Sequence, residues 1–334
     1  MTSRTRHDPD KNDAGQMPEI PDFILSGVCG AGASGTVWIG TDRDGIRRAV
    51  RVLRRDALPP ERIDAEKQAV SAYRNLVSGE AGLIEVLYTG ETAEALYYVM
   101  PLADNRPGER NGYRPDTLAA RIGDAAYRRD AKLNDLTGIA AALRKMHDRG
   151  LAHRDLKPEN ILFLAGRPVI ADPGSCGPLA EVADAGTPGY QPPVPARGDA
   201  ADLHAFGKIV YTVFSGYPPE RYPDISAKWN DSFAAGIDRI VLRCCESGPE
   251  SFRDAAELHA ELRKLAEREG IRPRRRSFPI AGAVLSAAAV LLILCVGALA
   301  SLRPPAVQFA SGKTPGRSAR QTAGRLMSAD RGGR

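Results

Sequence analysis

The sequence is poor in cysteine, in aromatic residues and, relative to its positive charge, in lysine. Its five cysteines lack the spacing of metal ligands, which argues against a cysteine-based metal centre and favours free thiols. Aromatic residues make up 6% of the chain and form no stripe with basic residues, so nucleic acid is not an expected partner. Only nine of the 46 basic residues are lysines, and a lysine at a motif position is therefore informative.

The chain also lacks an apolar segment at its start, so no secretory signal is expected. One long apolar run lies instead at residues 279–300, which contain no charged side chain. As a helix this run spans about 33 Å, enough to cross the hydrocarbon core of a bilayer. A buried helix of a soluble protein is the alternative, but such helices are seldom apolar on every face. We expect a single membrane-spanning helix over residues 279–302.

Basic residues are more frequent before this run than after it. Those before it are Arg263, Lys264, Arg268, Arg272, Arg274, Arg275 and Arg276, and those after it are Arg303, Lys313, Arg317 and Arg320. The asymmetry predicts that the N-terminal side faces the cytoplasm. The expected order is a basic linker at 269–278, the span, and a basic extracytoplasmic tail at 303–334. Such a chain is a single-pass protein of the cell membrane, with the lipid bilayer as a partner.

The N-terminal part reads as a polar tail followed by strands. Residues 1–21 show no periodicity and are expected to be disordered. Over residues 22–101 short apolar runs alternate with turn residues, as in an antiparallel sheet. The runs are FILSGV, GTVWIG, RRAVRVL, LIEVLYTG and ALYYVM. One helix interrupts them after Pro59, and its predicted inner face carries Ile63, Glu66, Val70, Tyr73 and Val77.

Residues 102–268 read as helices. Leu136, Ile139, Leu143 and Met146 share one face of a helix that Gly150 can cap. Residues 202–215 are apolar nearly all round, as in a central buried helix, and a last amphipathic helix carries Leu258, Leu262 and Leu265. The sequence predicts an α+β fold in which a small β-rich part precedes a larger helical part, with a cleft between them.

The strongest chemical signal is the string His-Arg-Asp-Leu-Lys-Pro-Glu-Asn-Ile-Leu at residues 153–162. It places a carboxylate (Asp155), a cation (Lys157), a rigid Pro158 and an amide (Asn160) at fixed offsets. Phosphoryl transfer needs a base for the incoming hydroxyl group, a positive charge near the moving phosphoryl group and oxygen ligands for Mg²⁺. A solvated polar loop would explain one tripeptide equally well, but not ten residues in this order.

This string resembles the catalytic loop of protein kinases, and Lys157 and Glu159 are similar to their serine/threonine branch. The resemblance covers residues 22–268 and implies a two-lobed kinase fold, with lobes at 22–101 and 102–268. Together with the expected span, the layout is similar to membrane-anchored bacterial serine/threonine kinases of the eukaryotic-like (Hanks) type. It implies transfer of the ATP γ-phosphoryl group to Ser or Thr of protein substrates. Mg²⁺ is the implied metal with Mn²⁺ as an alternative, and a second copy of the chain stays open as a partner.

Three glycines give the pattern G-x-G-x-x-G-x-V between two strand-like runs. Without Cβ atoms, such glycines let backbone N–H groups approach phosphates. A tight hairpin would explain the pattern equally well, and the strand that follows it argues against a dinucleotide fold. By its place before Asp155 it resembles the glycine-rich loop of kinases. The residues that the resemblance assigns to ATP on this side are Gly30, Gly32, Gly35, Val37, Ala49, Arg51, Met100 and Leu162.

Arg51 stands where the resemblance implies a lysine that pairs with the phosphates and with a helix glutamate. Arginine keeps the charge but presents a wider planar fork, so the change is not conservative. A loss of two to three decades in rate would correspond to about 2.7–4 kcal/mol of transition-state stabilisation. Glu66, on an otherwise apolar helix face, is the expected partner of Arg51, and an exposed ion pair is the alternative. A bidentate pair would hold Arg51 away from the nucleotide.

Asp172-Pro173-Gly174 follows an apolar run and resembles the kinase Asp-Phe-Gly, although a plain turn is the alternative. The resemblance makes Asn160 and Asp172 the metal ligands. Pro173 removes an aromatic packing switch and predicts an extended backbone at Asp172.

The segment ending in Gly186-Thr187-Pro188-Gly189 resembles the end of an activation segment. Val194 replaces an expected glutamate, which would leave Arg253 without its partner. Between 172 and 193 the aliphatic hydroxyls are Ser175 and Thr187, so Arg154 is expected to meet Glu181 or Asp184 instead of a phosphate. His153 is expected to be structural, and Asp202 resembles the aspartate that ties down the catalytic loop.

The resulting assignment is an ATP-dependent protein serine/threonine kinase with reduced or unusual activity. Asp155, Lys157, Arg51 and Glu66 are its catalytic candidates. The alternative is a pseudokinase that binds nucleotide or acts as a scaffold, and Arg51, Pro173 and Val194 favour it. A small-molecule phosphotransferase of related fold is a third class, which the full Leu-Lys-Pro-Glu-Asn string disfavours.

Overall fold

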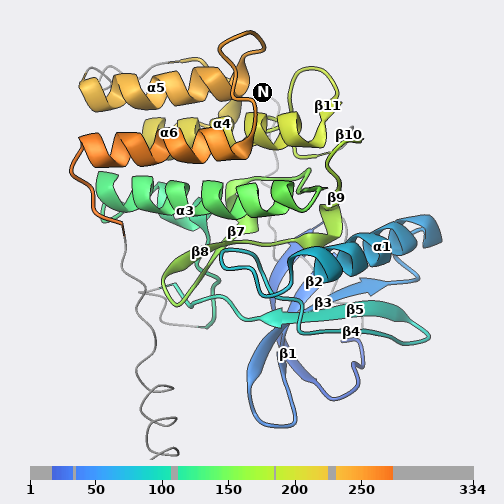
Figure 1. The fold of residues 1–334 in the computed structure, drawn as a ribbon. Coiled ribbons are helices and arrows are strands. Elements are labelled where there is room, and N and C mark those ends of the chain that lie inside the picture. Colours follow the sequence, from blue (N-terminus) through green and yellow to red (C-terminus); the bar gives the residue numbers. More distant parts are fainter. Residues whose placement is uncertain (1–16, 33–34, 107–111, 184–185, 225–230, 274–334) are drawn as a thin grey trace, which may run out of the picture. The chain divides into compact units, whose positions relative to one another are not determined.

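Along the chain, an antiparallel sheet with one helix between its third and fourth strands precedes a mainly helical region (Figure 1). The computed structural model describes residues 17–32, 35–106, 112–183, 186–224 and 231–273. The antiparallel sheet has the order β1-β2-β3-β5-β4. Its strands are β1 (Ile24–Gly32), β2 (Gly35–Thr41), β3 (Arg47–Arg54), β4 (Tyr88–Glu91) and β5 (Ala95–Pro101), and the helix is α1 (Pro60–Val77). The predicted α+β division is confirmed.

The two faces of the sheet bury different sets of side chains, because successive residues of a strand point to opposite sides. One face carries Ala49, Leu53 and Met100, which belong to the main core shared with α1 and the helical region. The other face has a small core of its own, made of Ile20, Leu25, Val50, Val52, Ala95, Tyr97 and Val99. Ile20, just before the boundary predicted at residue 22, is also buried there.

The run LIEVLYTG is the least well predicted strand. Only its last part is β4, which begins at Tyr88. The first residues leave the sheet because Ile84 bonds elsewhere: its N–H donates to the carbonyl of Ile170 at 2.9 Å, and its carbonyl accepts from the Tyr73 hydroxyl group at 2.7 Å. These contacts join the sheet region to the helical region, and a strand pattern in the sequence cannot reveal them.

Among its described residues, the helical region contains the three predicted helices and two that were not predicted, α2 and α5. Its helices are α2 (Leu118–Ile122), α3 (Arg129–Asp148), α4 (Gly198–Ser215), α5 (Ser232–Cys245) and α6 (Ala255–Arg268). Short elements complete it: β6 (Leu151–Ala152), η1 (Pro158–Asn160), β7 (Ile161–Leu164), β8 (Arg167–Ile170), η2 (Pro173–Ser175), β9 (Gly177–Pro178), β10 (Val182–Ala183), β11 (Ala196–Arg197) and η3 (Pro219–Arg221). α3 packs against α6, and α4 packs against α5, which the sequence analysis did not predict.

The apolar faces predicted for α1 and α3 are buried as expected. Gly150, just after α3, has φ +74° and donates its N–H to the carbonyl of His147 at 2.9 Å, so the predicted cap is confirmed. α4 is buried along most of its length.

Among the described residues, no helix has both the length and the apolar character needed to span a membrane. The predicted span at 279–302 and the tail at 303–334 lie outside the described residues, as do residues 1–16 of the tail predicted at 1–21. The start of the predicted linker is described: Ile271 packs against the main core, and the Arg272 carbonyl accepts a hydrogen bond from Asn134 on α3 at 3.2 Å.

Candidate active site

The loop at residues 153–162 is held in place by one buried carboxylate. Asp202, on α4 and 1% exposed, accepts the backbone N–H groups of His153 and Arg154, each at 2.8 Å. His147, on α3, approaches the same carboxylate with Nε2 at 2.9 Å. Three donors allow this carboxylate to be buried. The predicted contact of Asp202 with the loop backbone is confirmed, and His147 is a partner that the sequence analysis missed.

His153 is a structural residue, as predicted. Its Nε2 lies 2.6 Å from the carbonyl oxygen of Ala171, which can only accept, so Nε2 carries the proton. Its Nδ1 accepts the backbone N–H of Asp155 at 3.3 Å. Both ring nitrogens are thereby used to fix the loop, and neither is placed to take a proton from a substrate.

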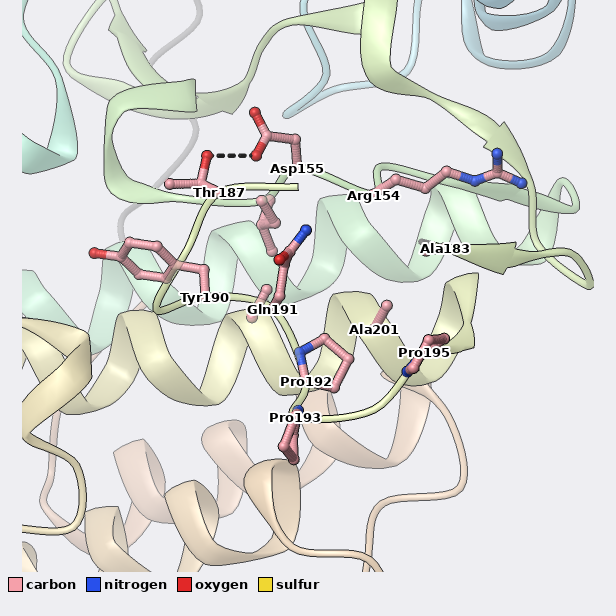
Figure 2. A pocket seen from close by; sticks show the side chains of 12 residues that line it. Arg154, Asp155, Ala183, Thr187, Tyr190, Gln191, Pro192, Pro193, Pro195 and Ala201 are labelled. Carbon is pink, nitrogen blue, oxygen red and sulfur yellow. Dashed lines mark hydrogen bonds between the residues drawn. The ribbon is translucent and has the colours of Figure 1, made fainter. Parts of the chain in front are cut away.

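The carboxylate of Asp155 is the focus of the site. Lys157 Nζ donates to Oδ2 at 2.7 Å. The Thr187 hydroxyl group donates to Oδ1 at 2.7 Å, the bond drawn as a dashed line in Figure 2. Lys157 Nζ also lies 2.7 Å from Thr187 Oγ1, which closes a triangle of donors and acceptors. Burial raises the pKa of Asp155, but the hydrogen bonds from Lys157 and Thr187 outweigh it and hold that pKa below its ordinary value. The carboxylate therefore stays ionised and can accept a proton.

A cavity of about 220 Å³ opens beside Asp155. Figure 2 shows Asp155 and Thr187 at one end of it, with Tyr190 and Gln191 further along the same segment. The other lining residues mix charged and apolar side chains and include Arg154, Pro192, Pro193, Pro195, Ala183, Ala201 and Ala205. The cavity can accept a short length of another chain next to an ionised carboxylate.

Asn160 and Asp172 lie close together because the backbone N–H of Ala171 donates to the Asn160 carbonyl at 2.8 Å. Asn160 Nδ2 donates to the Asp155 carbonyl at 2.8 Å, which turns the amide oxygen away from Asp155. Asp172 Oδ1 is buried and accepts no hydrogen bond within the described residues, and its cationic neighbour is Arg51 Nη1 at 3.5 Å. A buried carboxylate oxygen that accepts no hydrogen bond is a suitable ligand for a hard cation such as Mg²⁺.

The described residues hold no cluster of three or more His, Cys, Asp or Glu side chains that could bind a metal unaided. A cation at Asn160 and Asp172 therefore needs oxygens from outside the protein, such as those of phosphate groups or water. This donor set fits a metal that arrives with a nucleotide.

The extended backbone predicted for Asp172 is wrong. Asp172 has φ 62° and ψ 63°, in the left-handed region, and Pro173 then begins the turn η2. Such a conformation costs a non-glycine residue about 1–3 kcal/mol, so its surroundings must hold it. Ser175 Oγ lies 3.1 Å from the Asp172 carbonyl oxygen and 2.9 Å from that of His153. These contacts override the local preference that proline imposes.

Arg51 and Glu66 form the predicted pair, with Nε 3.0 Å from Oε1. Arg51 Nη1 also lies 3.5 Å from Oδ1 of Asp172, so the guanidinium group lies between two carboxylates. Burial raises the pKa of Glu66, while Arg51 acts to lower it. Burial acts to lower the pKa of Arg51, but Tyr98, Asp172 and Glu66 outweigh it and raise that pKa, so the guanidinium group stays charged.

Two further residues contact Glu66 and were not singled out from the sequence. The Tyr98 hydroxyl group donates to Oε1 at 3.1 Å. A Cβ atom on Gly174 would lie 2.5 Å from that oxygen, so only glycine leaves room for the carboxylate. The alternation of Tyr97 and Tyr98 indicates that one of them faces the main core. Their partners depend on the pairing of β3 with β5, which the sequence does not show.

The glycine pattern lies on β1 and β2, where Gly30 pairs with Val37 and Gly32 pairs with Gly35. Only Gly35 among the three has a backbone that demands glycine, with φ +142°, and a Cβ atom there would lie 2.7 Å from the Val52 carbonyl oxygen. Residues 33–34, at the tip between the strands, lie outside the described residues. The backbone of the hairpin therefore explains why residue 35 is glycine. It does not explain Gly30 and Gly32, which stay candidates for contact with phosphates.

Of the apolar residues assigned to ATP, Val37, Ala49 and Met100 lie on the five-stranded sheet and Leu162 lies on β7. Ala49 and Met100 are direct partners across β3 and β5, and both are buried. Val37 and Leu162 are half-buried and pack against the same core. All four residues thus belong to the main core or pack against it.

The segment after Asp172 is fixed by Arg154. Its Nη2 donates to the Pro178 carbonyl at 2.8 Å and to Glu181 Oε2 at 3.0 Å, so the predicted contact with Glu181 is confirmed. Asp184 lies outside the described residues. With Val194 in place of the expected glutamate, Arg253 contacts another carboxylate: its Nε lies 3.2 Å from Glu257 Oε2.

Comparison with known proteins gives one consistent match. Residues 23–268 match the protein kinase domain. Calcium/calmodulin-dependent protein kinase type 1 of Macrobrachium nipponense is 30% identical over 226 residues, which cover 62% of this chain and 61% of that protein.

Two bacterial relatives are similar as well. Serine/threonine-protein kinase Pkn1 of Myxococcus xanthus is 28% identical over 279 residues, covering 71% of this chain and 38% of its own length. Serine/threonine-protein kinase PknB of Mycobacterium tuberculosis is 29% identical over 149 residues, covering 36% and 24%. The chain therefore spans less than two thirds of the length of these three relatives.

Proposed function

This chain belongs to the protein kinase family, and we propose that it transfers the γ-phosphoryl group of ATP to serine or threonine hydroxyl groups of proteins. One observation carries the proposal: the ionised carboxylate of Asp155, held by Lys157 and Thr187, borders a cavity that can accept a peptide. The printed names of the two similar bacterial proteins, which call them serine/threonine-protein kinases, support the class of acceptor.

In the proposed reaction the acceptor oxygen forms a bond to the γ-phosphorus, and the bond from that phosphorus to the β,γ-bridging oxygen breaks. ADP leaves with the bond electrons, and the hydroxyl proton passes to Asp155 and then to water. Lys157 lies beside the same carboxylate, where its ammonium group can steady the transferring group. Thr187 fixes the direction of the carboxylate that takes the proton.

Asn160 and Asp172 would hold Mg²⁺, and Mn²⁺ is an alternative with the same oxygen ligands. When bound, the ion supplies positive charge to the phosphate oxygens. The buried, hydrogen-bond-free Oδ1 of Asp172 supports this assignment.

Arg51 would contact the phosphates from β3 in place of a lysine. Its ion pairs with Glu66 and Asp172 place the charge beside the proposed metal ligand. Because a guanidinium group is wider than an ammonium group and already lies between two carboxylates, we propose reduced transfer activity. Ala49, Met100, Val37 and Leu162 would enclose the adenine.

A second candidate, a pseudokinase that binds nucleotide or partners without transfer, is favoured by the same two ion pairs of Arg51. The purified full-length protein in mild detergent can decide, with radiolabelled ATP, Mg²⁺ and a generic acceptor protein. The kinase assignment requires phosphate on serine or threonine that disappears in Asp155→Asn. Native protein that gives no more signal than Asp155→Asn, together with a gain in Arg51→Lys, would establish the pseudokinase instead.

The contact of Arg154 with Glu181 further suggests an enzyme that needs no phosphorylation switch. Ser175 contacts two carbonyl oxygens and Thr187 contacts Asp155, so both hydroxyl groups already have structural partners. A large rate increase after phosphorylation of either residue would contradict this part of the proposal.

We also propose a single-pass anchor at residues 279–302, with the kinase domain in the cytoplasm, as in membrane-bound bacterial kinases of the eukaryotic-like (Hanks) type. The uncharged run and the basic residues before it support the anchor. The test is fractionation in alkaline carbonate, which should leave the native chain in the membrane pellet. Recovery of the chain in the supernatant would refute the anchor.

A further inference from the structure

Tyr98 occupies an unusual place for a polar side chain. It lies directly across from Arg51 in the pairing of β3 with β5, and it is 1% exposed. Its neighbour Tyr97 is equally buried but belongs to the small core on the opposite face of the sheet. Tyr98 therefore brings a hydroxyl group into the main core, where a polar group needs a partner.

That partner is the glutamate that holds Arg51. The Tyr98 hydroxyl group donates to Glu66 Oε1 at 3.1 Å, and Arg51 Nε donates to the same oxygen at 3.0 Å. Gly174 lies against the carboxylate from another side, where a Cβ atom would come within 2.5 Å of Oε1. Residues of β3, β5, α1 and η2 thus meet at one carboxylate oxygen.

This arrangement bears on which edge of the guanidinium group faces Glu66. An arginine can present its two terminal nitrogens, or Nε and one terminal nitrogen, to a carboxylate. Here Nε faces Oε1, and Nη1 lies toward Asp172, 3.5 Å from its Oδ1. The Tyr98 phenol donates to Oε1 from the side of β5, which fixes the direction of the carboxylate and favours this approach of the guanidinium group. A lysine ammonium group, which has no fixed fork, would need no such guidance.

We propose that Tyr98 is a positioning residue that adapts the nucleotide site to arginine at position 51. It holds Glu66 so that Arg51 contacts the glutamate through Nε and extends its terminal nitrogens toward Asp172 and the phosphates. The inference rests on the nucleotide-binding part of the proposed function. It does not require that transfer is fast.

The test is a double-mutant cycle on the full-length protein with four members: native, Tyr98→Phe, Arg51→Lys and the double variant. The dissociation constant of Mg·ATP is measured by calorimetry, KM for ATP and kcat by radiolabel transfer, and Tm by thermal unfolding. Tyr97→Phe is the matched control, because it removes a hydroxyl group from an equally buried tyrosine on the other face.

We expect Tyr98→Phe to weaken Mg·ATP binding about tenfold when arginine is at position 51, as loss of a hydrogen bond to a charged group would. With lysine at position 51 the same change should alter the dissociation constant less than about twofold, since no planar guanidinium group is then present for Glu66 to orient. Tyr97→Phe should leave the dissociation constant and KM unchanged.

Equal weakening in both backgrounds would overturn the inference, as would a lower Tm without any change in nucleotide affinity. The inference would also be overturned if none of the four proteins binds Mg·ATP. Coupled binding without phosphate transfer would support the inference and reject the kinase activity, so the two failures are distinguishable.

Discussion

Asp155 and Glu66 are two carboxylates beside a cation in one site, and the pKa values of the two move in opposite directions. Asp155 is partly exposed and accepts from Lys157 and Thr187, which lowers its pKa. Glu66 has a side chain only 4% exposed, and burial dominates, which raises its pKa in spite of Arg51. On the acceptor side of the site, hydrogen-bond donors that are partly exposed to solvent therefore decide the pKa of the carboxylate.

On the nucleotide side, the burial of the Arg51–Glu66 pair has the larger effect on the pKa of Glu66. Changes on the acceptor side should mainly lower kcat, because they alter a group that works in the chemical step. Changes on the nucleotide side should mainly alter KM for ATP. The following predictions test that division.

The largest effect should come from Asp155→Asn. An amide cannot accept the hydroxyl proton, so we expect kcat about 10³-fold lower, within the range for loss of a general base. The dissociation constant of Mg·ATP, measured by calorimetry, should stay within about twofold of native, because Asp155 lies on the acceptor side. A variant that loses nucleotide binding together with turnover would break the division between the two sides.

Thr187→Val should have the next largest effect. It removes a hydrogen bond to the ionised carboxylate and a contact of Lys157, so kcat should fall about 10- to 100-fold with little change in KM for ATP. Thr187→Ser keeps the hydroxyl group and is the control, with activity near native. If valine and serine have equal effects, the hydroxyl contacts do not matter for turnover.

Gly174→Ala should act on the other side. The added Cβ would come within 2.5 Å of Glu66 Oε1 and displace the carboxylate that holds Arg51. We expect KM for ATP to rise about tenfold, which corresponds to about 1.4 kcal/mol, while kcat changes less. Gly248→Ala is the matched control, because a Cβ atom there meets nothing within 4 Å. A selective fall in kcat would contradict this assignment.

The smallest effect concerns pH. Because the pKa of Asp155 lies below its ordinary value, the carboxylate stays in its proton-accepting form as the solution is acidified. Its protonation should lower kcat only at pH values below the ordinary pKa of an aspartate side chain. Thr187→Val removes one donor that stabilises the ionised form, so the acid limb of its kcat profile should move to higher pH. A limb that shifts to lower pH, or does not shift, would argue against Asp155 as the group that titrates.

The sequence predicts well what depends on local periodicity. The three- and four-residue spacing places Glu66 on the buried face of α1, and its partner Arg51 follows from a resemblance over the whole domain. Fixed offsets within one loop also place Asp155, Lys157 and Asn160 together.

What depends on distant segments is not predicted. Ile84 bonds to Ile170 instead of continuing a strand, and Asp172 adopts a left-handed backbone that the following proline disfavours. Tyr98 reaches Glu66 only because β3 pairs with β5 in one particular register. Each of these outcomes depends on hydrogen bonds between segments that are distant in the sequence. Such bonds exceed the local backbone preference by a few kcal/mol at most.

The buried carboxylate of Asp202 has a consequence for amide hydrogen exchange. The N–H groups of His153 and Arg154 donate to a side chain on α4 and not to a strand or helix ladder. Because Asp202 is 1% exposed, water reaches these two amides only when α4 separates from the loop. Their exchange should therefore be as slow as that of core amides in α4. The loop that carries the chemistry would then open only together with the core helix.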